Sequence, residues 1–209
     1  MTRTTLRRPQ APAWLKPLVF LLGLLPLALL LWRGLTGGLG ANPIEAVIRF
    51  NGDWALRLLL VTLAVTPLRQ LTGWSWVMRV RRMIGLFAFF YAVLHLLGYV
   101  VLDQFFDWGA IFADILKRPY ITVGMTAFAL LVPLAVTSTN AMMRRLGGRR
   151  WQQLHRLVYP AAMLGVLHFY WLVKADVREP LLYAALLAVL LGYRLAQRLH
   201  RRKQVAAVA

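Results

Sequence analysis

The chain has 209 residues, 60% of them hydrophobic, and its mean hydropathy is +0.61. A soluble core of this length could not hide so much apolar surface, so the composition indicates a polytopic membrane protein. The formal net charge is +18, but the basic residues gather at the ends of apolar runs, where lipid headgroups and membrane topology explain them better than nucleic acid does. The chain has no cysteine, which excludes disulfides, cysteine-ligated iron–sulfur clusters and covalent C-x-x-C-H haem attachment.

Six apolar runs are candidates for membrane-spanning helices. A basic N-terminal segment, residues 1–16, precedes the first run, and a basic tail, residues 196–209, follows the last. Residues 17–195 between them form the membrane domain. The predicted spans are 17–32, 54–68, 84–102, 120–137, 151–173 and 181–195.

Basic residues alternate along the loops in a way that fixes the orientation. The N-terminus, the 69–83 loop, the 141–156 loop and the C-terminus are strongly basic, whereas the three loops between them are mixed or acidic. Because positive charge stays on the cytoplasmic side, six spans with both termini in the cytoplasm satisfy every loop. The sequence therefore predicts an all-α, polytopic bundle of six transmembrane helices.

Local signals refine the connections between these spans. Residues 44–50 form a short amphipathic piece before the second span. Ser138, Thr139 and Asn140 are good capping residues for a short polar helix that Gly147 and Gly148 can end.

Two histidines are predicted to stand at the same depth in the membrane. His95 in the third span and His168 in the fifth each lie about 18 Å past a basic inner edge, at 1.5 Å per residue. A buried imidazole needs a partner for its nitrogens. Two neutral imidazoles facing each other across a helical bundle are the axial pair of a b-type haem. A simple hydrogen-bonded histidine pair is the alternative.

Three further residues have both a functional and an ordinary interpretation. Arg57 lies near the predicted outer start of the second span, where it either extends to the interface or neutralises a haem propionate. His155 is thirteen residues before His168, about 20 Å along a helix, and either stays wet or serves a second, inner site. On an ideal helix their side chains diverge by about 140°, so a shared face requires a kink, which Pro160 can provide. The inner partner that His155 would need in the third span is replaced by Arg81.

The chain resembles the MsrQ family, formerly called YedZ, almost from end to end. These proteins are haem-binding membrane subunits of a bacterial system that reduces methionine sulfoxide in periplasmic proteins. The motifs that carry the resemblance are GGLGANP at 37–43, TPLR at 66–69, RRMIGL at 81–86 leading to LH at 94–95, RPYITVG at 118–124, TSTNAM at 137–142, WQQLHRLVY at 151–159 and HFYWLVK at 168–174.

The resemblance implies a ferric-reductase-type transmembrane domain in the bacterial inner membrane. In this fold the fifth helix carries two haem-ligating histidines thirteen residues apart, which match His155 and His168, and the third helix carries an outer ligand that matches His95. Arg81 stands where the similar membrane half of NADPH oxidases has an inner haem ligand. The resemblance therefore implies either one haem b or two, and it leaves His155 as a lone ligand or as a quinone or flavin contact. FMN is associated with the family, but no residues here identify its site.

The resemblance also implies partners. Electrons are expected from the quinol pool or a cytoplasmic flavin reductase, and they pass to MsrP, a periplasmic molybdopterin enzyme that carries out the sulfoxide chemistry. The sequence has no G-x-G-x-x-G after a strand, so the chain must be supplied by another component. Membrane lipids are the other expected contact, and nucleic acid is not. The alternative functions are a stand-alone ferric reductase-type cytochrome, and a haem-free transporter or assembly factor.

Overall fold

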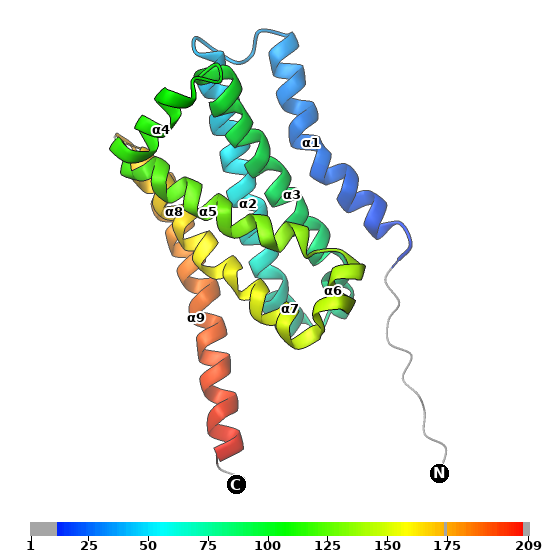
Figure 1. Ribbon diagram of the computed structural model, residues 1–209. Coiled ribbons are helices and arrows are strands. Elements are labelled where there is room, and N and C mark those ends of the chain that lie inside the picture. Colours follow the sequence, from blue (N-terminus) through cyan, green and yellow to red (C-terminus); the bar gives the residue numbers. More distant parts are fainter. Residues whose placement is uncertain (1–11, 174, 207–209) are drawn as a thin grey trace, which may run out of the picture.

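The computed structural model describes residues 12–173 and 175–206, and every regular element in these ranges is a helix (Figure 1). Residues 1–11 of the predicted N-terminal segment and 207–209 of the tail lie outside the described residues. The elements are α1 (Leu15–Leu35), α2 (Pro43–Thr72), η1 (Ser75–Val77), α3 (Met78–Leu97), η2 (Gly98–Asp103), α4 (Trp108–Lys117), α5 (Pro119–Val136), α6 (Asn140–Leu146), α7 (Gly148–Leu154), η3 (His155–Leu157), α8 (Val158–Leu172) and α9 (Arg178–Ala206).

Five stretches of helix within the described residues are long and apolar enough to cross a membrane, so the chain is a multi-pass membrane protein. The fifth predicted span, 151–173, is divided among α7, η3 and α8. Helix α8 alone has 15 residues and rises about 22 Å, less than the roughly 30 Å of a hydrocarbon core. The five stretches are Leu15–Leu35, Pro43–Thr72, Ser75–Asp103, Pro119–Val136 and Arg178–His200.

The second predicted span is longer than expected. The predicted amphipathic piece at 44–50 and the span at 54–68 form one continuous helix, α2. Asn42 caps it by accepting a hydrogen bond from the Glu45 backbone N–H, and Pro43 occupies the first turn. The polar Asn51 does not break the helix, because its side-chain amide donates to the Val47 carbonyl one turn earlier at 2.8 Å. Arg57 therefore lies in the middle of a helix and not in its first turns.

The connection after the third predicted span contains a helix that the sequence did not predict. Helix α3 begins at Met78, earlier than the predicted span at 84–102, and continues as the π-helix η2 to Asp103. In the predicted loop, the Asp107 side chain then accepts a hydrogen bond from the Ala110 N–H at 3.0 Å and caps α4.

The fifth predicted span is interrupted one turn before its proline. Pro160 has no N–H for the carbonyl of Arg156, and its ring crowds that carbonyl, which weakens the α-helix at this turn. The 3-10 turn η3 interrupts the helix here, between α7 and α8. A 3-10 turn therefore stands where the sequence predicted a kink between His155 and His168, and it begins at His155 itself.

Helices α5, α6 and α9 follow the predicted signals more closely. The fourth span matches α5, and Thr139 caps α6 by accepting from the Met142 N–H at 3.1 Å. Gly147, at φ 74°, ends α6, but α7 starts directly after it. The predicted sixth span is the middle of α9, whose helix continues through the described part of the basic tail.

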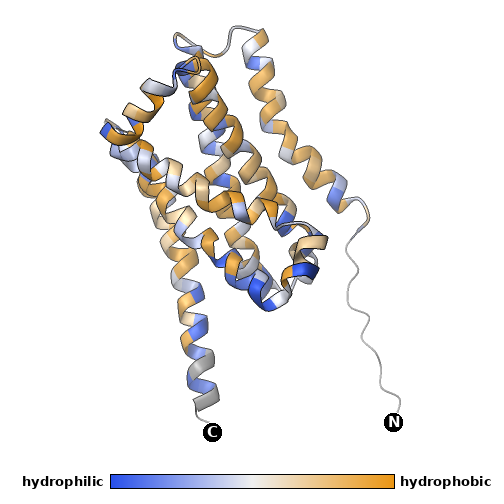
Figure 2. Cartoon of the chain, in the orientation of Figure 1, coloured by the Kyte–Doolittle hydropathy of each residue, from blue (hydrophilic) through white to orange (hydrophobic). Residues whose placement is uncertain are grey.

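The core gathers where α2, α3, α5, α8 and α9 meet. Helices α2 and α3 pack closely along their length, as do α5 and α8, and α9 closes the side of α2 and α8. In Figure 1, α4 lies at one end of the bundle, and α6 and α7 lie at the other, where Figure 2 shows hydrophilic residues gathered. The buried core side chains are Leu56, Leu59, Leu60, Leu63, Ala88, Leu134, Val158, Ala162, Val166, Tyr183 and Leu187.

A buried tyrosine on α3 makes one of the contacts that attach helix α1 to the bundle. The Tyr91 side chain on α3 is 0% exposed. Its hydroxyl accepts from the Leu27 N–H at 3.1 Å and donates to the Gly23 carbonyl at 2.7 Å. In a regular helix that N–H and that carbonyl pair with each other, so the hydroxyl bridges the ladder beside Pro26 and ties α1 to α3.

We expect Tyr91→Phe to weaken the attachment of α1, because the substitution leaves a buried N–H and a buried carbonyl without the bridging hydroxyl. The expected loss is about 1–3 kcal/mol in the free energy of unfolding. Thermal unfolding in detergent measures it, with Tyr170→Phe as the control, because the Tyr170 side chain is 43% exposed. Equal midpoints for the two variants would contradict the bridging role.

Candidate functional site

His95 and His168 lie side by side, as their matched depth predicts. Their ring centroids are 6.0 Å apart, and the ring planes cross at 80°. His95 comes from α3, two residues before its end, and His168 comes from α8. The two helices belong to different close pairs, α2 with α3 and α5 with α8, so the site stands where the two pairs meet.

Each of the two imidazoles is anchored to the other helix of its own pair. His95 Nδ1 bonds to the Ile48 carbonyl on α2 at 2.8 Å, and His168 Nδ1 bonds to the Tyr120 carbonyl on α5 at 2.7 Å. A carbonyl oxygen only accepts, so Nδ1 carries the proton in both rings. The neutral imidazole then has its lone pair on Nε2, which is the state a metal ligand requires.

The pair fits a haem iron. An iron atom about 2 Å from one nitrogen of each ring would separate the two ring centroids by roughly 6 Å, which is the separation found. Two neutral imidazoles, each with a backbone carbonyl behind it, are a donor set that suits a haem iron. His95 and His168 would hold the group.

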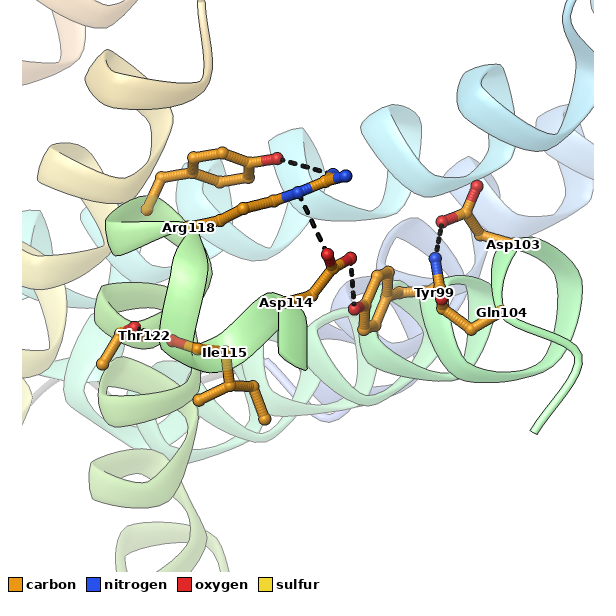
Figure 3. Close-up of polar contacts among 8 residues, drawn as sticks. Tyr99, Asp103, Gln104, Asp114, Ile115, Arg118 and Thr122 are labelled. Atoms are coloured by element: carbon orange, nitrogen blue, oxygen red, sulfur yellow. Dashed lines mark hydrogen bonds and ion pairs between the residues drawn. The ribbon is translucent and has the colours of Figure 1, made fainter. Parts of the chain in front are cut away.

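A polar network around α4 connects the segments that lie next to the two histidines (Figure 3). The Tyr99 hydroxyl donates to Asp114 at 3.1 Å, and Arg118 Nε lies 3.0 Å from the same carboxylate. Arg118 also donates to the Tyr120 hydroxyl at 3.3 Å, a bond that, with Asp114, raises the pKa of Arg118. Tyr99 follows His95 by one turn, and the Tyr120 carbonyl holds His168, so the network fastens η2, α4 and the start of α5 together.

His155 has a different environment, at the end of the bundle where α7 lies. Its ring stacks on Trp151, with centroids 3.7 Å apart, and its Nδ1 bonds to the Trp151 carbonyl at 3.0 Å. Its Nε2 lies 3.5 Å from the Ser138 hydroxyl. His155 is thus held within its own helical segment and by Ser138 between α5 and α6, and not by a second histidine.

Arg81 is partly buried on α3, near the face that carries His155. Arg194 of α9 and Tyr159 of α8 are among its neighbours, and Arg81 is itself a neighbour of His155. Arg194 donates to the Tyr159 hydroxyl at 3.0 Å and to the Leu63 carbonyl. Arg81 is therefore close enough to Arg194 and to His155 to interact electrostatically with both.

Arg57 has protein partners of its own. Its Nε donates to the Tyr183 hydroxyl on α9 at 2.7 Å, and its guanidinium lies over the Trp54 ring at 5.4 Å. Asp53, one turn earlier, is 3.8 Å away. The side chain remains 38% exposed, so it is partnered without being enclosed.

Known proteins match most of this chain. The family described as the ferric reductase like transmembrane component matches residues 51–166, which include His95 and His155. A relative from Rhodospirillum rubrum is 62% identical and covers 88% of this chain and 89% of its own length. One from Xanthomonas euvesicatoria is 55% identical, with 91% and 90% covered, and one from Herminiimonas arsenicoxydans is 50% identical, with 93% and 90% covered. This chain belongs to the MsrQ family. All three relatives are described as the haem-binding subunit MsrQ of a protein-methionine-sulfoxide reductase.

Sequence reasoning within this family missed the residues that hold the histidines. Ile48 and Tyr120 act through backbone carbonyls, which no side-chain pattern reveals. Tyr183, the partner of Arg57, is one of several tyrosines near helix ends and carries no signal of its own. Trp151 could have been found, because an aromatic residue four positions before a histidine shares its helix face.

Proposed function

We propose that this chain is the b-type haem electron-transfer subunit of a methionine sulfoxide reductase system. The observation that carries the proposal is the His95–His168 pair, at a ring separation of 6.0 Å and with both Nδ1 atoms bonded to carbonyls. Membership of the MsrQ family supports it, since the relatives are described as haem-binding subunits. When bound, the haem supplies a one-electron carrier in the outer half of the membrane.

The decisive first experiment is an absorption spectrum of the purified protein before and after dithionite reduction. Sharp b-type bands in the reduced protein are expected. Their absence would remove this function together with its nearest rival, a stand-alone ferric reductase-type cytochrome, and would leave a haem-free transporter or assembly factor.

The electron path follows from the orientation. We place the chain in the bacterial inner membrane with six spans, α8 and the segment before it forming the fifth, and with both termini in the cytoplasm. Electrons then enter from the quinol pool or a cytoplasmic flavin reductase and leave to MsrP, the periplasmic molybdopterin subunit. The basic character of the 69–83 and 141–156 loops supports this orientation.

Reporter fusions test the orientation. Fusions after Gly40, Asp107 and Asp176 should read periplasmic, and fusions after Gly73, Gly148 and Ala209 should read cytoplasmic, because the basic loops remain inside. A cytoplasmic signal at Asp107 would overturn the six-span arrangement and would put the His95–His168 pair on the wrong side for delivery to the periplasm.

We expect His95→Ala or His168→Ala to abolish most haem binding, because each removes one axial nitrogen. His155→Ala should remove only part of it, or should alter a second component on the cytoplasmic side, because His155 is held separately by Trp151 and Ser138. Haem content per folded protein is the measurement, and His200→Ala, in the basic tail, is the control. Full haem content in a folded His168→Ala protein would show that the outer pair is wrongly assigned.

The two arginines are proposed to serve anionic groups of the cofactors, Arg57 on the outer side and Arg81 on the inner side. Arg57 would pair with a haem propionate while Tyr183 holds its Nε in place. Arg81, beside His155, would pair with a propionate of a second haem or with the phosphate of FMN.

If Arg57 neutralises a propionate, Arg57→Gln should lower the reduction potential of the haem, because an unpaired carboxylate in low dielectric favours the ferric state. Arg81→Gln should disturb the inner component and spare the outer one. Potentiometric titration compares them with two matched controls, Arg49→Gln on the same helix as Arg57 and Arg82→Gln beside Arg81; Arg49 is paired with Glu45. Midpoint potentials and cofactor contents equal to wild type in both variants would remove the arginines from the site.

A further inference from the structure

The two anchored histidines share an arrangement that repeats in both helix pairs. In α2 and α3, His95 reaches the carbonyl of Ile48, and the residue four positions after Ile48 is Gly52. In α5 and α8, His168 reaches the carbonyl of Tyr120, and the residue four positions after Tyr120 is Gly124. Each imidazole therefore faces a carbonyl and a glycine that are one turn apart on a neighbouring helix.

The glycines stand where a side chain would collide with the imidazole. A Cβ added at Gly52 would lie 2.9 Å from His95 Nδ1, and a Cβ added at Gly124 would lie 2.7 Å from His168 Nδ1. Both distances are shorter than real Cβ contacts. The obstructed atom is in each case the nitrogen that makes the hydrogen bond, so the ring cannot move aside and keep its carbonyl.

Helix geometry explains why the glycine follows its carbonyl by four residues. The carbonyl of residue i points along the helix axis toward the N–H of residue i+4, and side chains four apart share a face. A second donor that approaches the carbonyl of residue i from that face must pass over residue i+4. Only glycine leaves this approach open to a ring.

We propose that Gly52 and Gly124 are positioning residues that seat the two haem-ligating imidazoles. Each carbonyl–glycine pair, Ile48 with Gly52 and Tyr120 with Gly124, holds the proton on Nδ1 and so directs the lone pair on Nε2 to the metal. The inference rests on the proposed function for the identity of the metal group. The steric part of it concerns the chain alone.

Haem binding is the first test. Gly52→Ala and Gly124→Ala should each weaken haem binding roughly 10- to 100-fold, the usual loss when a group supporting a metal ligand is removed, and should change the low-spin spectrum of what remains. Gly85→Ala and Gly165→Ala are matched controls on the ligand helices, because a Cβ there would make ordinary contacts of 3.5 and 3.6 Å. Haem content, spectrum and midpoint potential equal to wild type in Gly52→Ala and Gly124→Ala would overturn the proposal.

A crossed set of double variants separates ring seating from ordinary helix packing without using haem. Gly52→Ala should lower the thermal midpoint in the His168→Ala protein, where His95 is still present, and should not lower it in the His95→Ala protein, where the obstructed ring is gone. Gly124→Ala should show the reverse pattern. Both backgrounds lack one axial ligand, so differences in haem content do not decide the result.

The outcomes distinguish the two levels of the argument. Equal destabilisation of both backgrounds would mean that the glycines only let helices approach each other, and it would overturn the proposal. Crossed coupling in a protein whose wild type shows no haem bands would uphold the seating and reject the proposed function. If the double variants fail to fold, the haem content and spectrum of the single variants, set against Gly85→Ala and Gly165→Ala, decide.

Discussion

The structure depends on satisfying two imidazole N–H groups inside an apolar bundle. A buried donor without a partner costs roughly 1–3 kcal/mol, and water is scarce at this depth. Here the partners are the Ile48 and Tyr120 carbonyls, so the register of α2 against α3 and of α5 against α8 is tied to the two histidines. The unbroken course of α2 follows from this constraint: a helix that began at residue 54 would not bring the Ile48 carbonyl to His95.

His155, at the end of the bundle where α7 lies, is held differently from His95 and His168. His155 Nδ1 bonds to a carbonyl of its own segment, and the ring stacks on Trp151. Its tautomer is fixed by a carbonyl of its own segment, and its Nε2 lies 3.5 Å from the Ser138 hydroxyl between α5 and α6. The 3-10 turn η3 begins at His155 and separates it from α8, the helix that carries His168.

Much of the fold was predictable, because apolar runs, basic loops and caps are local signals. The matched depth of His95 and His168 was predictable too, since a helix converts residue number into distance. The continuous α2 and the helix α4 were not, because the Asn51 side-chain N–H and the Asp107 carboxylate bond to nearby backbone groups, which composition does not show. The backbone partners of the two histidines could not be predicted, because every residue type carries a backbone carbonyl. The sign of them in the sequence is a glycine one turn later.

Arg81 and Arg82 are adjacent in one basic loop of the sequence, but their environments in the structure differ. Arg82 is exposed, whereas Arg81 is partly buried near Tyr159, Arg194 and His155. None of the ion pairs among the described residues includes Arg81 or Arg194. Two neighbouring guanidinium groups repel each other in low dielectric, and Arg194 Nε is buried without a hydrogen-bond partner within the described chain. A bound anion would relieve both costs, and this is the physical ground for assigning Arg81, and not Arg82, to an inner cofactor.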